Sequence, residues 1–201
     1  FRPMFEKMII DADIIFFVGT IRDRYLSSAF KQFFDRSFYL NHKGIYEGKQ
    51  IGWLVSGPLG QIPNLRQIME AYADVSRGNL SGIVTDESGD DAFIDAQIDA
   101  LAERSVTFAR SGYVAPSTFL GDAGRRLFRD EIWGGMRIIF PEDYRYYRKT
   151  GRFDFPQKKM MNRFAVPLLV ALLKVPPFRK AFERGMRRGM IASLVKVVEN
   201  A

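Results

Sequence analysis

The stretch FFVGTIRDRYLSSAFKQFFDR, residues 16–36, changes its hydrophobic pattern halfway along. It opens inside the continuous apolar run ADIIFFVGT, which has the length and composition of a buried strand. After Ser27 the pattern becomes helical, with four phenylalanines on one face: Phe30, Phe33, Phe34 and Phe38. Ser27 or Ser28 is a suitable N-cap for that helix. The stretch therefore predicts a strand, a loop and a helix in succession.

The same order of elements recurs twice further along the chain. GKQIGWLVSGP (48–58) and NLSGIVTDE (79–87) have the composition of buried strands, and helical patterns follow them at 65–77 and 90–112. A shorter helical pattern at 3–11 precedes the first strand. Because alternating strands and helices are joined by right-handed crossovers, the sequence predicts an α/β fold with a parallel sheet covered on both faces.

The composition changes after residue 112. The sequence therefore predicts a core over residues 1–112 and a basic, aromatic-rich helical extension over residues 113–201, which ends in helices at 160–175 and 177–199. Residues 1–100 hold 10 Lys and Arg against 14 Asp and Glu, whereas the remainder holds 20 against 9, so the basicity belongs to the C-terminal half. The chain begins without a methionine and at once in helical pattern, so we expect further sequence upstream.

Several kinds of site are excluded or disfavoured by residue counts. The chain has no cysteine, which excludes disulfides and cysteine-ligated metal centres within it. Its single histidine, His42, lies in the polar turn LNHKGIYEGK and is predicted to be a solvated loop residue. The acidic pairs Asp86-Glu87 and Asp90-Asp91 precede a helix, where they favour capping over metal binding, and no metal site is predicted.

Targeting signals are also missing from the sequence as given. The longest apolar stretch, FAVPLLVALLKVP, is too short to span a membrane and is interrupted by Pro167. No signal peptide is visible, and we expect a cytoplasmic protein.

The loop that contains Arg22, Asp23 and Arg24 is the first candidate for ligand binding. In a parallel sheet the ligand crevice lies at the carboxyl ends of the strands, where this loop and the loop SGPLGQIPN (56–64) begin. A loop that only reversed the chain would more often use Gly, Pro or Asn. We therefore expect this loop to contact a ligand, the alternative being a solvated cluster of ion pairs.

ADIIFFVGTIRDRYLSSAFKQFFDR (12–36), continued by GKQIGWLVSGPLG (48–60), resembles the central part of NAD(P)H-dependent FMN reductases and related flavodoxin-like flavoproteins, including the iron–sulfur flavoprotein branch. Lys31, Asp35 and Arg36 match a Lys-x-x-x-Asp-Arg signature on the helix of that family. By themselves, these three residues are also typical of a salt bridge on a helix surface. The resemblance implies a flavodoxin-like three-layer sandwich whose first strand and phosphate-binding loop lie upstream of the sequence given.

The resemblance further implies an FMN site at two loops, one bordering the isoalloxazine ring and the other reaching its opposite edge. Ile21 stands where the family carries proline, and Tyr25 is the aromatic residue nearest to the family's tyrosine. The implied cofactor-binding residues are Thr20, Ile21, Arg22, Asp23, Arg24, Tyr25, Leu26, Ser27, Ser56, Gly57, Pro58, Leu59 and Gly60.

In such enzymes the flavin passes a hydride from NAD(P)H to a quinone, free flavin or other acceptor, and the protein supplies position and electrostatics. We therefore assign no acid–base catalyst and expect Arg22 or Arg24 to favour the anionic reduced flavin or a nicotinamide phosphate.

A second hypothesis comes from the C-terminal half. Between residues 177 and 199, Phe178, Phe182, Met186 and Met190 recur at steps of four among arginines. This pattern favours packing in a homo-oligomer, with contact of residues 160–201 with a membrane surface as the alternative. The aromatic run at 143–156 favours packing over nucleic-acid binding, and no nucleic-acid partner is expected. The alternative function is thus a non-catalytic flavodoxin-like module that binds a membrane or a protein partner through its basic half.

Overall fold

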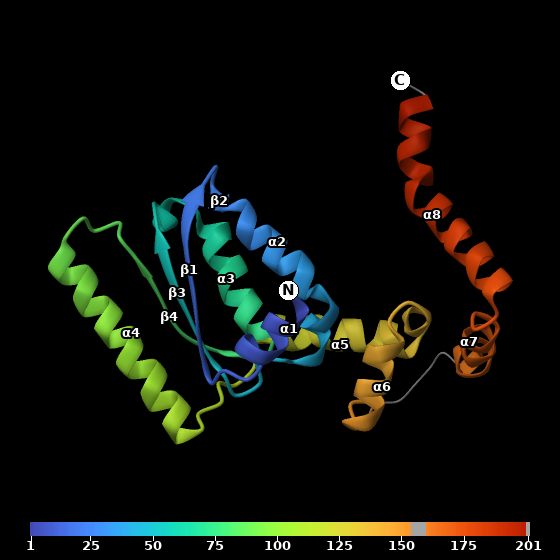
Figure 1. Ribbon diagram of the computed structural model, residues 1–201, viewed down its shortest axis with the longest axis horizontal. Coiled ribbons are helices and arrows are strands. Elements are labelled where there is room, and N and C mark those ends of the chain that lie inside the picture. The colour runs from blue at the N-terminus through green and yellow to red at the C-terminus, as the bar shows by residue number, and fades with distance from the viewer. Residues whose placement is uncertain (154–159, 200–201) are drawn as a thin grey trace. The chain divides into compact units, whose positions relative to one another are not determined.

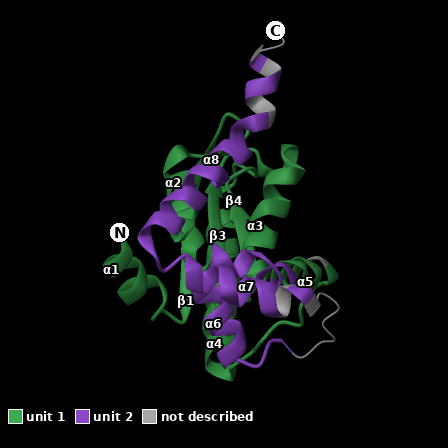
Figure 2. Ribbon diagram, turned by 90° about the vertical axis from the view of Figure 1, so that its right-hand side faces the viewer, with its two compact units in different colours: residues 1–128 green, residues 129–201 purple. Residues whose placement is uncertain are grey.

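The structure is a computed structural model that describes residues 1–153 and 160–199. It divides into two compact units, unit 1 over residues 1–128 and unit 2 over residues 129–201 (Figure 2). The described helices include none that is long and apolar enough to cross a membrane.

Unit 1 is built on a four-stranded sheet with the order β2-β1-β3-β4. The strands β1 (Ile14–Arg22), β3 (Gln50–Ser56) and β4 (Asn79–Thr85) run parallel to one another. The short strand β2 (Tyr25–Leu26) pairs antiparallel with the end of β1. The predicted α/β fold with a parallel sheet is therefore confirmed.

The helices that follow the strands lie on opposite faces of this sheet (Figure 1). The helices α2 (Ser28–Ser37) and α3 (Pro63–Val75) cover one face, and α4 (Asp91–Ser111) lies against the other. Ser27 stands at the N-cap position of α2 but makes no side-chain capping bond, whereas the Asp90 carboxylate caps α4 by accepting a hydrogen bond from the Phe93 N–H at 3.1 Å. Capping is thus the observed role of Asp90.

Shorter helical segments complete unit 1. The pattern predicted as one helix at 3–11 forms a single turn, α1 (Arg2–Met4), and a π-helical turn, η1 (Phe5–Ile9). The 3₁₀ segments η2 (Phe38–Lys43) and η3 (Leu59–Gln61) follow α2 and β3.

The main core lies between the sheet and the helices α2 and α3. Trp53 of β3 is fully buried, and its ring stacks on Phe17 of β1 with centroids 4.6 Å apart. Phe17 also meets Phe33 of α2 and Tyr72 of α3 edge to face, each at 5.6 Å. Full burial of such an apolar side chain contributes about 2 kcal/mol, so this cluster holds both helices on the sheet.

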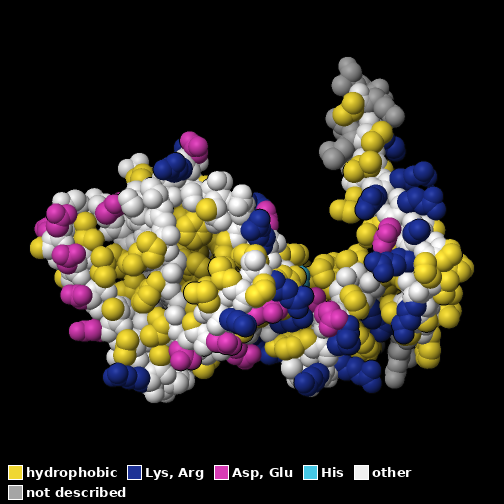
Figure 3. Space-filling model, viewed as in Figure 1, with side chains coloured by type: hydrophobic (Ala, Val, Ile, Leu, Met, Phe, Trp, Pro, Cys, Tyr) yellow, Lys and Arg dark blue, Asp and Glu magenta, His cyan; other side chains and the backbone are white. Residues whose placement is uncertain are grey.

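The opposite face of β1 is open. Phe16 and Val18 alternate with the buried Ile15 and Phe17, and they are 41% and 64% exposed. The helix α4 packs mainly on β4 and β3 and leaves these side chains uncovered, and Figure 3 shows apolar side chains gathered on this side of unit 1. The expected helical cover on both faces is therefore found for β3 and β4, whereas β1, which pairs with β2 only at Ile21 and Arg22, is largely uncovered on one face.

The remaining helices begin in the region where the sequence pattern is weakest. The helix α5 (Phe119–Trp133) runs from unit 1 into unit 2, and α6 (Pro141–Lys149) follows a short 3₁₀ turn, η4 (Met136–Ile138). The predicted C-terminal pair corresponds to α7 (Met160–Leu172) and α8 (Pro176–Glu199), which are separated at Pro176 as expected.

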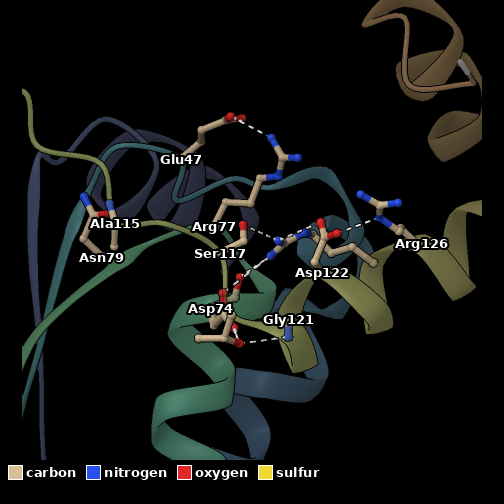
Figure 4. A network of polar contacts seen from close by, with 11 residues as sticks. Glu47, Asp74, Arg77, Asn79, Ala115, Ser117, Gly121, Asp122 and Arg126 are labelled. Atoms are coloured by element: carbon tan, nitrogen blue, oxygen red, sulfur yellow. Dashed lines mark hydrogen bonds and ion pairs between the residues drawn. The ribbon is translucent and has the colours of Figure 1, made fainter.

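Polar contacts explain why unit 1 ends at residue 128, whereas the sequence pattern changes at residue 112 (Figure 4). The Asn79 side chain donates to the Tyr113 carbonyl at 2.6 Å and accepts from the Ala115 N–H at 2.5 Å. The Arg125 guanidinium donates to the Asp74 carbonyl at 2.6 Å, and the Asp74 carboxylate accepts from the Thr118 hydroxyl. These contacts attach the start of α5 to α3 and β4.

The position of His42 differs from the one predicted from the sequence. Its ring is half-buried and stacks on Phe128 with centroids 3.6 Å apart, so the predicted solvated position is wrong. Burial, with a smaller effect from Lys43, lowers the pKa of His42 to about 4. The imidazole is therefore neutral at physiological pH and acts as a packing residue between η2 and α5.

Two glycines of α5 provide a matched test of this attachment. A Cβ atom on Gly121 would overlap the Asp74 carboxylate, whereas a Cβ on Gly124 meets nothing within 4 Å. We predict that Gly121→Ala lowers the free energy of unfolding by about 1–3 kcal/mol, as overpacking does, and that Gly124→Ala raises it by up to about 1 kcal/mol. Urea unfolding followed by circular dichroism measures both, and equal effects of the two variants would contradict the docking of α5 on Asp74.

Candidate functional site

The carboxyl ends of the parallel strands bring the two predicted loops together. Thr20 at the end of β1 lies opposite Ser56 at the end of β3 in the register of the sheet. Beyond them, a Cβ atom on Gly57 would lie 3.0 Å from the Cβ of Ile21. The residues that the sequence places in one site are therefore neighbours at one edge of the sheet, which we call the carboxyl edge.

The first of these loops is a β-hairpin, where the sequence analysis expected an irregular ligand-binding loop. Ile21 pairs with Leu26 and Arg22 with Tyr25, so the chain reverses at Asp23 and Arg24. Both turn residues have positive φ, 50° and 62°, as in the tight turns of two-residue hairpins. Such turns favour Gly, Asn and Asp, and Arg24 is an uncommon residue there. The three charges thus lie at and beside the tip of an exposed hairpin.

The second loop, Ser56–Gly60, is held by two carboxylates from the loop after β4. The Gly57 N–H donates to Asp86 Oδ1 at 2.7 Å, and the Gly60 N–H donates to both oxygens of Glu87 at 2.9 Å. The Ser56 hydroxyl and, to a smaller extent, the Gly57 N–H lower the pKa of Asp86 below its usual value. The loops after β3 and β4 are thereby joined into one surface.

These carboxylates determine which ligands the edge suits. Backbone N–H groups at such a position usually attract phosphate, but here the Gly57 and Gly60 donors already serve Asp86 and Glu87. The two negative charges also repel a second anion. The described residues contain no cluster of ligating side chains that could hold a metal ion. The loops after β3 and β4 therefore suit an uncharged group better than a phosphate.

The implied binding residues differ in their access to solvent. Leu26 and Leu59 are almost fully buried in the core, so their side chains position the backbone of the edge. Ile21, Tyr25, Ser27 and Gly57 are half-buried. The exposed members are Thr20, Arg22, Asp23, Arg24, Ser56, Pro58 and Gly60. The exposed set lines the hairpin tip and the second loop.

The sequence analysis missed Asp86 and Glu87 as partners of the second loop. Both follow β4 directly, so the parallel arrangement of the strands brings them to the same edge as Gly57. Their position directly after a strand predicts that they lie at this edge, but the sequence does not indicate which N–H groups the carboxylates contact.

The residues that carry the family resemblance lie on the surface of α2. Lys31 and Asp35 form an ion pair in which both side chains are exposed. The Arg36 guanidinium lies 5.8 Å from the ring centroid of Phe1. Their role in the structure is the helix-surface interaction that was one of the two interpretations of the pattern.

No family model matches the chain, and no curated protein matches it.

The hydrogen bonds that join the loop after β3 to the loop after β4 can be tested through the titration of Asp86. We predict that Ser56→Ala raises the pKa of Asp86 toward its usual value, because the hydroxyl is the largest stabiliser of the carboxylate. In the wild type the stabilisation of the loop by Asp86 is complete above pH about 4 and is lost as the pH falls through the lowered pKa.

The Gly57 amide resonance, followed by NMR against pH, reports this titration because its N–H bonds Asp86. Ser88→Ala is the control, since the Ser88 hydroxyl bonds only the backbone of Asp90 among the contacts described. An unchanged Gly57 titration midpoint in Ser56→Ala would contradict the Ser56–Asp86 contact.

Proposed function

We propose that the chain is an FMN-dependent NAD(P)H oxidoreductase that passes a hydride through the flavin to a quinone, free flavin or other small acceptor. The observation that carries the proposal is the meeting of the two loops at Ile21 and Gly57. Ligands of open parallel sheets bind outside the carboxyl ends of the strands, which is where these loops lie. When bound, the flavin supplies the hydride chemistry.

The arrangement of the strands supports a flavodoxin-like sandwich. In the flavodoxin-like strand order 2-1-3-4-5, the last three strands are neighbours in sequence order. The strands β1, β3 and β4 have the same relation. On this proposal β1 corresponds to the third strand of that order, and β3 and β4 to the fourth and fifth.

The charges at the carboxyl edge support contact with the ring of FMN rather than with its phosphate. Asp86 and Glu87 occupy the Gly57 and Gly60 donors and repel a phosphate, so the ring is the part of FMN that this edge suits. Arg22 and Arg24 at the hairpin stabilise the negative charge that the ring acquires on reduction. These two arginines have no ion-pair partner among the interactions described.

The role of the arginines gives a specific prediction. Replacing both by glutamine is expected to weaken binding of reduced FMN by about fivefold per charge, the size of one exposed charge interaction, and to change binding of oxidised FMN less. The measurement is FMN titration of the purified protein by visible absorbance and fluorescence, together with the midpoint potential of the bound flavin, which falls in the variant.

Lys7→Gln with Arg110→Gln is the control, because both side chains are exposed in unit 1 outside the carboxyl edge and the pair changes the net charge equally. No flavin absorbance in the purified protein, together with no spectral change on adding FMN, would reject the proposed function.

A second candidate function is a non-catalytic module that attaches to an anionic membrane or a protein partner through unit 2. The observation that favours it is the exposure of large apolar side chains on α7 beside the basic residues of α8, with Met161, Phe164 and Leu168 each more than 60% exposed. An apolar face beside arginines is typical of helices that lie in a membrane interface.

Replacing Phe164 and Leu168 by serine separates the two functions. We predict a loss of sedimentation with anionic vesicles by more than about tenfold, since each buried apolar side chain contributes about 2 kcal/mol. FMN binding is expected to be unchanged. Ile191→Ser, on the far half of α8, serves as the control, and vesicle binding that is equal in all variants would reject attachment through α7.

A further inference from the structure

Unit 2 contains a cavity in which every charged side chain of the described lining is basic. The cavity has a volume of about 610 Å³ and lies among η4, α6 and the end of α7. Four cationic side chains line it: Arg137, Arg145, Arg148 and Lys174. Its described lining includes no carboxylate. Figure 3 shows basic side chains beside apolar ones over unit 2.

Two of these cations have no counter-charge in the part of the chain that the structure describes. Arg145 pairs with Glu142 at the cavity's exposed rim, and the Arg137 guanidinium lies 5.1 Å from the ring centroid of Tyr144. Arg148 and Lys174 have no ion pair among the described residues. Two cations without an ion-pair partner attract an anion, and a guanidinium together with an ammonium suits the several oxygens of a phosphate.

An unsatisfied hydrogen-bond donor lies in the same region. A cavity of about 410 Å³ shares Arg137, Tyr144 and Arg148 with the basic cavity and is also lined by Trp133. The Trp133 Nε1 is buried and has no hydrogen-bond partner among the described residues. A buried donor without an acceptor is uncommon and costs stability, so it indicates a place for an acceptor supplied from outside.

The basic cavity continues into an apolar one. A third cavity, of about 520 Å³, shares Pro141, Val170 and Lys174 with it. Its wall is mostly apolar, and includes Ile138, Ile139, Leu173, Phe182 and Met186. Glu183, the one carboxylate among its described lining residues, is paired with Arg179 at 2.9 Å. The groove therefore has a basic end and an apolar end, with Lys174 at the junction.

We propose that this groove binds an anionic amphiphile, with a phosphate headgroup against Arg148 and Lys174 and an apolar chain along Val170 and Phe182. The phosphate and the chain can belong to a membrane lipid or to a free alkyl or prenyl phosphate. The site is separate from the carboxyl edge, and the proposal does not rest on flavin binding.

The test uses the full chain and a double variant, Arg148→Gln with Lys174→Gln. Both side chains are exposed and make no ion pair with a described residue, so their replacement is expected to leave the fold intact. Arg187→Gln with Arg188→Gln is the matched control, because these exposed arginines of α8 change the charge equally and line none of the three cavities. The probes are inorganic phosphate, hexyl phosphate and dodecyl phosphate, with dodecyl maltoside as the uncharged comparison, and tryptophan fluorescence reports binding near Trp133.

We expect affinity to rise from inorganic phosphate to dodecyl phosphate, and to fall by about tenfold or more in the double variant, as for loss of a charge-assisted hydrogen bond. The control pair is expected to bind like the wild type. Val170→Ser is expected to weaken dodecyl phosphate and to leave inorganic phosphate unchanged. Equal binding by the wild type and the double variant, or tighter binding of dodecyl maltoside than of dodecyl phosphate, would overturn the proposal.

Vesicles of phosphatidylcholine with and without phosphatidic acid separate the two sources of the ligand. Binding that requires phosphatidic acid and is lost in the double variant supports a lipid headgroup, and the Phe164 and Leu168 variant then tests the membrane contact alone. Binding of hexyl phosphate without vesicle binding supports a free phosphorylated ligand. Vesicle binding that both double variants lose equally would reject the groove in favour of non-specific attraction to the basic surface.

Discussion

The parallel pairing of β1 with β3 is the constraint on which the rest of unit 1 depends. It sets Phe17 beside Trp53, and their stacked rings form the centre of the core that holds α2 and α3. The same register sets Thr20 opposite Ser56, so the loops that follow leave the sheet at one edge. A shift of the register by one residue would turn Phe17 out of the core and separate the loops. Core and candidate site are thus consequences of one alignment.

The sequence predicts this part of the fold well because its signals are local. Continuous apolar runs mark the strands, helical spacing marks the helices, and the caps Ser27 and Asp90 lie where the residue types require them. The helices α5 and α6 could not be predicted from local patterns. The helix α5 is held by contacts between residues distant in sequence, such as Arg125 with Asp74. The burial of His42 is not predictable from its local sequence either, because its partner Phe128 lies far along the chain.

The sequence predicts which loops meet at the candidate site, but it does not predict their conformation or their hydrogen bonds. Parallel strands deliver their loops to a common edge, so the neighbourhood of Ile21 and Gly57 follows from the strand pattern. The hairpin at Asp23 and Arg24 does not follow, because its turn lacks the glycine or asparagine that marks such turns. The bonding of Gly57 by Asp86 depends on the path of two loops in space, about which residue spacing says nothing.

The two units differ in the charged groups that they offer to an anion. In the loops after β3 and β4, Asp86 and Glu87 take up the backbone donors that would otherwise attract a phosphate, and both side chains are negatively charged. In unit 2, Arg148 and Lys174 line a cavity without a carboxylate among its described residues. Because each charge is set by neighbours within its own unit, the contrast does not depend on how the units are arranged. On the two proposals, the phosphate of an amphiphile binds in unit 2, and the carboxyl edge of unit 1 contacts the ring of FMN and not its phosphate.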